Sequence, residues 1–489
     1  MLNTLDGRYS VPCRQTIRKE VINRHDSMRE EILKELVKPR KLSITCDIWS
    51  SVTMQSYLGV TVHFIDDEWN LCHFLLDLCY FPGQHTSQRI EEFIMRVLED
   101  ANITNKLLCM TTDNAASMVA AGCAIKERLS AVGNVKFIHH RCSAHILNIA
   151  VQHGLRRVSP IVTKVREFVK KIWQSSRLCD SLRVVCQLEN TVELKPELDV
   201  ETRWNSTYLM LRKFQRMRDV LNILVAKHRE LDALYLHDDD WSKVSTMIVL
   251  LEPMYDATEI LSSSTYPTIS DVRLTFGALR HHLHTFVQNH TEESIIVVVD
   301  AINNKLEEYW AYVNDSTKIG ALLDPRSKTK TFLDSNQRDE AISLLKECMP
   351  SYIDVEGVNN ASTSTRCRNK RLFFESLISD QAVDEIPPED ELTRYIATPV
   401  SSDSDSLGWW RRFQGDFPIL ARMASCYLSM QGSSVPSEQA FSMAANTITK
   451  IRCNLKPDTA RAAMCLKSWI QQVCDKREDD CEDLILLET

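Results

Sequence analysis

Three acidic residues far apart in the chain restrict the folds that it can adopt. Asp47 lies in Cys-Asp-Ile-Trp-Ser-Ser, Asp113 in Thr-Asp-Asn-Ala-Ala, and Glu438, more than three hundred residues later, in Ser-Val-Pro-Ser-Glu-Gln-Ala-Phe. The patterns predict that the first two end strands and that the third begins a helix. Three carboxylates that meet in space offer the oxygen ligands that Mg²⁺ prefers. Two such ions stabilise the attacking and the leaving oxygen when a phosphodiester bond is cut.

The composition is that of an ordinary globular protein. The 489 residues are 44% hydrophobic and 25% charged, and this length suits roughly three domains at ~150 residues each. No apolar stretch approaches the ~20 residues of a membrane span, and the first residues do not resemble a secretory signal. We therefore expect an intracellular protein without a membrane partner. The net charge of −8 still allows local basic grooves that could hold DNA.

The 16 cysteines are scattered in the way expected of buried thiols in a reducing compartment. No Cys-x-x-Cys occurs, so we see no zinc finger of the paired-cysteine kind. His139, His140, Cys142 and His145 could be interpreted as zinc ligands. Structural zinc usually needs two spaced ligand pairs, and no second pair is evident.

The region from 41 to 141 has the pattern of an α/β domain, preceded by a helical arm within residues 1–40. Tyr57 to Ile65 alternates apolar residues with the period of a half-buried strand, and Trp69 to Phe81 is its expected antiparallel partner. The expected order is three strands, a helix, a strand, a helix and a strand.

Amphipathic helices dominate from residue 142 to 407, the expected extent of a helical domain. One helix is predicted from Trp204 to about Leu231, and residues 355–392 are expected to be a partly disordered linker. From 408 to 489 the pattern is again helical. The predicted helix from Pro457 to Val473 is apolar on most sides, which indicates burial in the monomer or against a partner chain.

Six motifs follow one another along the chain. They are Cys-Asp-x-Trp-Ser-Ser, Thr-Asp-Asn-Ala-Ala, His-Arg-Cys-x-x-His, Thr-Arg-Trp-Asn-Ser, Leu-Asp-Pro-Arg and Ser-x-Pro-Ser-Glu-x-x-Phe-Ser. In order and spacing they resemble the hAT superfamily of DNA transposases and its domesticated relatives, from about residue 40 to the end. Many hAT proteins begin with a BED-type zinc finger. None is found in this sequence, which leaves the recognised DNA sequence open.

The resemblance implies an RNase H-like α/β core interrupted by a large all-α insertion. The core would comprise residues 41–141 and 408–489, and the insertion residues 142–407. Asp47, Asp113 and Glu438 would form the carboxylate site for Mg²⁺ or Mn²⁺, with no small-molecule cofactor. The C-terminal part would also form a homodimer or higher oligomer, for which Leu466, Trp469 and Ile470 are the candidate residues.

DNA would be the partner of the insertion. By resemblance, Trp204 would stack on a flipped base, so we expect one face of its ring to be accessible. Other candidate DNA contacts are Arg203, Cys142, His145, Arg156, Arg157, Lys170 and Lys171. For the basic residues a solvated helix face is the default alternative, and Trp204 taken alone is more often a core residue.

Each acidic residue alone also has a structural interpretation. Asp47 could end a strand, Asp113 could cap a turn or helix, and Glu438 suits the first turn of a helix because its charge complements the helix dipole. Their occurrence in three family-like motifs in the right order favours a common site.

Three functions remain open. The first is a transposase that hydrolyses DNA and then transfers strands through a freed 3′-hydroxyl, first into a hairpin and later into target DNA. The second is a domesticated, non-cutting dimer that binds DNA and regulates transcription or chromatin. A third, weaker possibility is a stand-alone nuclease. A nuclear location is expected, with the cytoplasm as the alternative.

Overall fold

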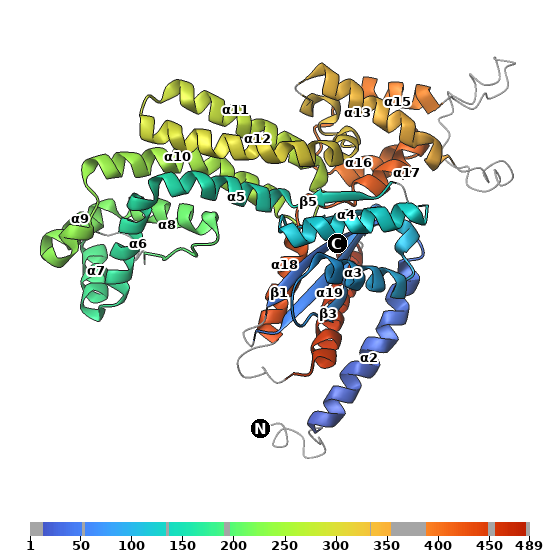
Figure 1. Ribbon diagram of the computed structural model, residues 1–489, viewed down its shortest axis with the longest axis horizontal. Helices are drawn as coiled ribbons and strands as arrows, with labels where there is room; N and C mark the ends of the chain where they lie inside the picture. Colours follow the sequence, from blue (N-terminus) through green and yellow to red (C-terminus); the bar gives the residue numbers. More distant parts are fainter. Residues whose placement is uncertain are drawn as a thin grey trace, which may run out of the picture.

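The computed structural model describes residues 13–50, 54–133, 136–189, 196–332, 334–353, 388–447 and 455–485. A twisted sheet covered by helices forms one part, and an elongated helical arm extends from it (Figure 1). The strands are β1 (Leu42–Ser50), β2 (Ser56–Ile65), β3 (Leu71–Tyr80), β4 (Leu107–Thr112) and β5 (Ile138–Arg141). The helices around the sheet are α2 (Arg14–Glu35), α3 (Ser87–Asp100), α4 (Ala116–Ala131), α18 (Val435–Thr447) and α19 (Pro457–Ile485).

The remaining helices form the arm and a smaller group beside the sheet. Those of the arm are α5 (Ser143–Leu155), α6 (Ser159–Trp173), α7 (Ser176–Leu188), α8 (Trp204–Arg216), α9 (Arg218–Lys227), α10 (Asp238–Leu261), α11 (Ile269–Asn289) and α12 (Glu293–Leu322). The smaller group comprises α13 (Ser335–Cys348), α15 (Pro388–Ala397), α16 (Ser406–Phe413) and α17 (Pro418–Tyr427). Short 3-10 helices are η1 (Thr104–Lys106), η2 (Arg156–Val158), η3 (Arg229–Leu234), η4 (Lys328–Thr331) and η5 (Met349–Tyr352).

The sheet has the order β3-β2-β1-β4-β5, with β1 antiparallel to β2 and parallel to β4. The predicted strands and their order along the chain are therefore confirmed. The prediction of a half-buried β2 was wrong, because every residue of β2 after Ser56 is buried. Helices cover both faces of this strand, so the alternation in its sequence does not separate core from solvent.

The two faces of the sheet differ in chemistry. Because side chains alternate along a strand, Ile44 and Cys46 point to one face of β1, while Ser43 and Thr45 point to the other. The first face belongs to an apolar cluster that includes side chains of α3 and α4. On the second face, Thr45 and Ser43 are hydrogen-bonded to serines near the C-terminus of the chain.

Helix α19 closes the outer edge of the sheet at a β-bulge in β3. The register between β2 and β3 shifts at Val60/Thr61. Beside it, the backbone N of Leu75 donates to Ser468 Oγ at 2.9 Å, and Trp469 Nε1 donates to the Leu75 carbonyl at 2.8 Å. The apolar circumference of this helix thus serves the monomer. Trp469 is fully buried and Leu466 is 7% exposed, so the expectation that they lie at a dimer surface was wrong.

Two helical predictions also need correction. The expected long helix from Trp204 is divided at Met217 into α8 and α9. The end of the expected linker is helical, because α15 begins at Pro388 and buries Leu392 and Tyr395. The rest of that linker, residues 355–387, lies outside the described residues. Over the described ranges, no helix combines the length and the apolar character that crossing a bilayer requires.

Candidate active site

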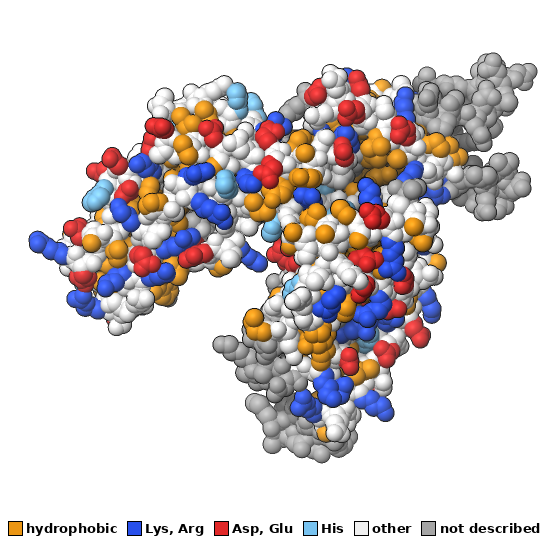
Figure 2. Space-filling view, in the orientation of Figure 1, with side chains coloured by type: hydrophobic (Ala, Val, Ile, Leu, Met, Phe, Trp, Pro, Cys, Tyr) orange, Lys and Arg blue, Asp and Glu red, His pale blue; other side chains and the backbone are white. Residues whose placement is uncertain are grey.

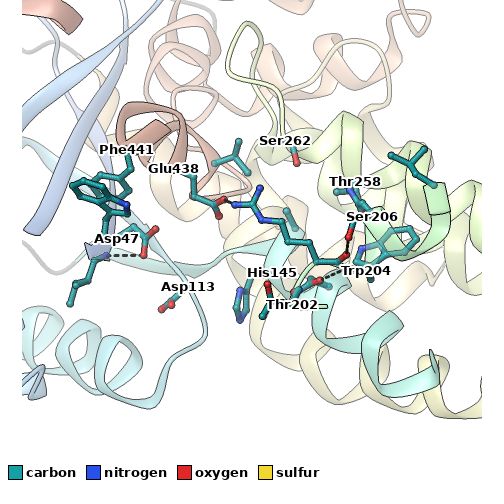
Figure 3. Close-up of a pocket in the computed structure, with 18 residues that line it drawn as sticks. Asp47, Asp113, His145, Thr202, Trp204, Ser206, Thr258, Ser262, Glu438 and Phe441 are labelled. Atoms are coloured by element: carbon teal, nitrogen blue, oxygen red, sulfur yellow. Dashed lines mark hydrogen bonds and ion pairs between the residues drawn. The ribbon is translucent and has the colours of Figure 1, made fainter. Parts of the chain in front are cut away.

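A cavity of about 800 Å³ lies between the sheet and the arm. One side is formed by β1, the end of β4 and α18, the other by α5, α8 and the turn before α8. In the space-filling view the molecule is hollowed between these two parts (Figure 2). Asp47, Asp113 and Glu438 all line this cavity (Figure 3).

Asp47 and Asp113 are placed together by strand register. The parallel pairing of β1 with β4 joins Thr45 to Thr111 and Cys46 to Thr112. The next residue after each member of the last pair is an aspartate. Asp113 directly follows the end of β4, whereas Asp47 lies inside β1 and shares the face of Thr45. The prediction that Asp47 ends its strand was wrong, because the pairing of β1 with β2 continues to Ser50. Neighbouring strands lie only ~4.8 Å apart. The two carboxylates are therefore neighbours at the same edge of the sheet.

The electrostatics of Asp47 reflect this crowding. Burial, together with the carboxylates of Asp113 and then Glu438, raises the pKa of Asp47 to about 7. The backbone N–H of Ile48, which donates to Asp47 Oδ1 at 2.8 Å, opposes the rise. A carboxylate held among other carboxylates is a favourable ligand for a cation, which supplies the missing positive charge.

Glu438 reaches this side because α18 docks on the polar face of the sheet. Ser437, the residue before it, shares a buried hydrogen bond of 2.8 Å with Thr45 Oγ1, two residues before Asp47. Thr45 Oγ1 also lies 3.1 Å from His63 Nε2 on β2. Because all three groups are buried, breaking this chain would leave unsatisfied polar atoms.

A close approach by α18 also depends on Gly59. This residue is the partner of Asp47 in the β1–β2 register. A Cβ at Gly59 would lie 2.7 Å from two ring atoms of Phe441, and Phe441 in turn stacks on Trp49 at a centroid distance of 6.0 Å. The small residue opposite Asp47 therefore leaves the space that the first turns of α18 fill.

The segment before α18 is joined to the start of the arm. Ser143 N donates to the Gly432 carbonyl at 2.9 Å, and Cys142 Sγ accepts from Ser434 N at 3.3 Å and from His145 N at 3.4 Å. Cys142 is 1% exposed, so it caps α5 and does not reach solvent. The expectation that Cys142 contacts DNA was wrong for this reason. His145 is half-buried and lines the cavity.

The third carboxylate has a basic partner. Arg203 Nη2 lies 3.5 Å from Glu438 Oε2, and the dashed line from Glu438 in Figure 3 marks this ion pair. Within the described ranges, no group of three or more His, Cys, Asp or Glu residues is arranged to hold a metal ion. The three carboxylates thus share a cavity but do not form a closed ligand cluster in this structure.

Trp204 lies across the cavity from Asp47, among the helices of the arm (Figure 3). Its side chain is only 1% exposed, and its indole Nε1 is buried without a hydrogen-bond partner. The expectation of an accessible ring face was wrong, because the first turn of α8 packs this residue into the apolar core of the arm. In this structure Trp204 is a packing residue.

The basic candidates of the arm fall into two groups. Arg156, Arg157 and Lys171 are exposed, whereas Lys170 is partly exposed and bonded to Glu167 at 3.0 Å. Arg166, from the same stretch, is turned inward in a bidentate ion pair with Asp199. Exposure on the arm is compatible with phosphate contacts, and for the four candidates this role stays a prediction.

Three positioning residues were missed from the sequence: Thr45, Ser437 and Gly59. Ser437 lies inside a quoted motif, directly before Glu438, and Thr45 directly precedes the motif of Asp47. Their proximity to the acidic residues in the sequence was therefore a usable signal. Gly59 gave none, because its importance depends on a ring that lies far away in the chain.

Family models match three segments in chain order. Residues 45–137 match the ZBED1 RNase-like domain, residues 140–250 the ZBED1 RNase-like helical domain, and residues 391–470 the hAT family C-terminal dimerisation region. The C-terminal part of the chain is thus similar to hAT proteins, as the motifs predict. The expected fold class, an RNase H-like α/β core with a large helical part, is thereby confirmed.

Curated relatives include both transposases and other hAT-related proteins. The chain is 27% identical to a putative AC transposase of Zea mays over 96% of its own length and 62% of the relative's. It is 26% identical to a putative transcriptional regulator, tpeD, of Talaromyces stipitatus, over 93% of its length and 56% of the relative's. It is also 26% identical to the zinc finger BED domain-containing protein RICESLEEPER 2 of Oryza sativa, over 96% and 70%. The chain thus spans less than two thirds of the transposase's length.

Proposed function

We propose that this chain is a hAT-type transposase that cuts DNA in a divalent-metal-dependent reaction and then transfers the strand. The observation that carries the proposal is the placement of Asp47 and Asp113 side by side, each directly after the last residue pair of the parallel β1–β4 ladder, with Glu438 lining the same cavity. Two aspartates in this relation, with a glutamate on a helix that docks on the same face, are the arrangement on which the expected chemistry depends.

The donor chemistry of the three residues fits Mg²⁺ or Mn²⁺, which are hard cations that take carboxylate oxygens. When bound, such an ion would stabilise negative charge on the attacking and leaving oxygens. Asp47 would supply its carboxylate after losing the proton that its raised pKa, about 7, allows it to hold. Asp113 would contribute the neighbouring carboxylate, and the hydrogen bond between Thr45 and Ser437 would keep the start of α18 beside them.

DNA is the proposed substrate, and the nucleus the proposed location. The cavity opens between the core and the arm, and exposed Arg156, Arg157 and Lys171 on the arm could contact phosphates. A homodimer is also proposed, because residues 391–470 match a dimerisation region. Of the three residues suggested for the interface, Ile470 is the one that remains available, since 47% of it is exposed.

A second function is favoured by a specific observation. The chain is similar to a putative transcriptional regulator, and a non-cutting protein of that kind would not need the three carboxylates to bind a metal. The chain would then act as a dimer that binds DNA and regulates transcription or chromatin.

A plasmid-nicking assay separates the two functions. The purified chain is incubated with supercoiled plasmid and Mg²⁺ or Mn²⁺, and DNA binding is measured in parallel by gel shift. The transposase proposal expects metal-dependent nicking that disappears with Asp47→Asn. Binding without nicking at saturating metal would reject it and support the regulator.

A further inference from the structure

Arg203 extends from the arm to the acidic side of the cavity. Its guanidinium nitrogen Nη2 lies 3.5 Å from Glu438 Oε2, and both residues line the cavity together with Asp47 and Asp113. The side chains of Arg203 and Glu438 are 74% and 44% exposed. An ion pair of this exposure is weak and readily changes partners.

The backbone of Arg203, in contrast, is firmly held. Its N–H donates to the Val200 carbonyl at 2.8 Å. On the residues beside it, Asn148 of α5 donates to the Thr202 carbonyl at 3.5 Å and accepts from Trp204 N at 3.3 Å. Helix α5 is itself tied, at its first residues, to the segment that leads into α18. Helix α5 thus positions the backbone of Arg203 relative to Glu438, and the side chain of Arg203 is the part that can move.

We propose that Arg203 is a positioning residue that holds Glu438 in the metal-free protein and competes with an incoming divalent cation for its carboxylate. This inference rests on the proposed metal site. Binding of a cation at Asp47 and Asp113 would draw Glu438 away from Arg203. The released guanidinium could then bind a phosphate oxygen, which its planar donors suit. The pair therefore couples metal entry to the exposure of a phosphate-binding group.

The test measures Mn²⁺ affinity by electron paramagnetic resonance on the DNA-free chain at low ionic strength. Arg203→Gln removes the competitor, so Mn²⁺ should bind about two- to fivefold more tightly, the range expected from an exposed ion pair. Arg203→Lys keeps the charge and should restore an affinity near that of the wild type. Circular dichroism and melting curves establish that each variant is folded.

A double-mutant cycle separates the pair from a general charge effect. In the Glu438→Gln background, where Asp47 and Asp113 remain, Arg203→Gln should no longer change the Mn²⁺ affinity. An equal gain in both backgrounds would overturn the inference, because the charge of Arg203 would then act on the whole cavity. Mn²⁺ binding that depends on Asp47 but ignores Arg203→Gln would overturn the inference alone. Absence of any Asp47-dependent binding would overturn the metal site and the inference with it.

Discussion

The two faces of the sheet are covered by helices that are held to it by different interactions. The apolar face is covered by α3 and α4, which lie close to the strands in sequence and pack through aliphatic side chains. The polar face is covered by segments more than three hundred residues away. They are joined to it through hydroxyl groups such as those of Thr45 and Ser437, in addition to apolar contacts such as that of Phe441 with Trp49. Apolar packing tolerates small shifts, whereas hydrogen bonds require defined distances and angles. On the face that holds the carboxylates, the hydrogen bonds therefore fix the position of α18.

The largest expected effect is on DNA nicking, which should be lost by a substitution on the polar face and kept by one on the apolar face. Asp113→Asn should remove metal-dependent nicking, a loss of at least about a hundredfold, since a catalytic metal contributes several kcal/mol to the reaction. The fold should persist, because the change is isosteric. The matched control is Cys46→Ala, which alters the opposite face beside Asp47 and should retain nicking. Equal losses in both variants would show that the faces do not differ in this way.

The second prediction concerns the segment that closes the sheet edge. Trp469→Ala should lower the free energy of unfolding by about 3–5 kcal/mol, because a buried indole and its bond to the Leu75 carbonyl are lost. Ile470→Ala, on the exposed side of the same helix, should change it by only about 0.5 kcal/mol. Urea unfolding gives both values. Light scattering on Ile470→Asp then tests the proposed interface, and an unchanged dimer would place the interface elsewhere.

The third prediction compares a polar contact with an apolar one in the same strand. Thr45→Val should cost about 1–3 kcal/mol, because His63 and Ser437 lose a buried partner. Ile44→Val, on the apolar face, should cost about 0.5–1.5 kcal/mol. The sharper readout is Mn²⁺ affinity, which should fall for Thr45→Val alone, since only that change loosens the start of α18. A similar affinity in both variants would contradict the positioning role.

The smallest expected effect is a pH dependence of the Mn²⁺ affinity, which arises from Asp47 on the polar face. Because the pKa of Asp47 is about 7, a cation must displace a proton at pH 6 but not at pH 8, so Mn²⁺ affinity should rise about tenfold between them. The free energy of unfolding of the metal-free protein should change in the opposite direction, falling as the pH rises. The pKa in the folded state lies above the ordinary value of 3.8, so stability falls as the pH rises from about 4 to about 7.

Calorimetric Mn²⁺ titrations at pH 6, 7 and 8 check the direction, with Asp47→Asn as the control that should lose the dependence. An affinity that is independent of pH over this range would show that Asp47 is already ionised.

The sequence by itself determined the elements and the edge of the sheet at which the first two carboxylates lie. Local patterns sufficed for this, because the periods of strands and helices can be recognised from neighbouring residues. The end of β1 was predicted too early, since the strand continues past Asp47 to Ser50 through its pairing with β2. The motif order was enough to suggest the RNase H-like fold, the helical block and the family.

The tertiary structure alone decided which side of each helix is buried. The apolar circumference of α19 does not reveal whether β3 or a second chain covers it, and the bulge beside Leu75 settles that question for Trp469. Likewise, Trp204 follows an exposed arginine in the sequence, yet its ring enters the core of the arm. The pairing of Arg203 with Glu438 and the space at Gly59 depend on segments hundreds of residues apart. No local pattern records such contacts, because burial is a property of the partner as much as of the residue.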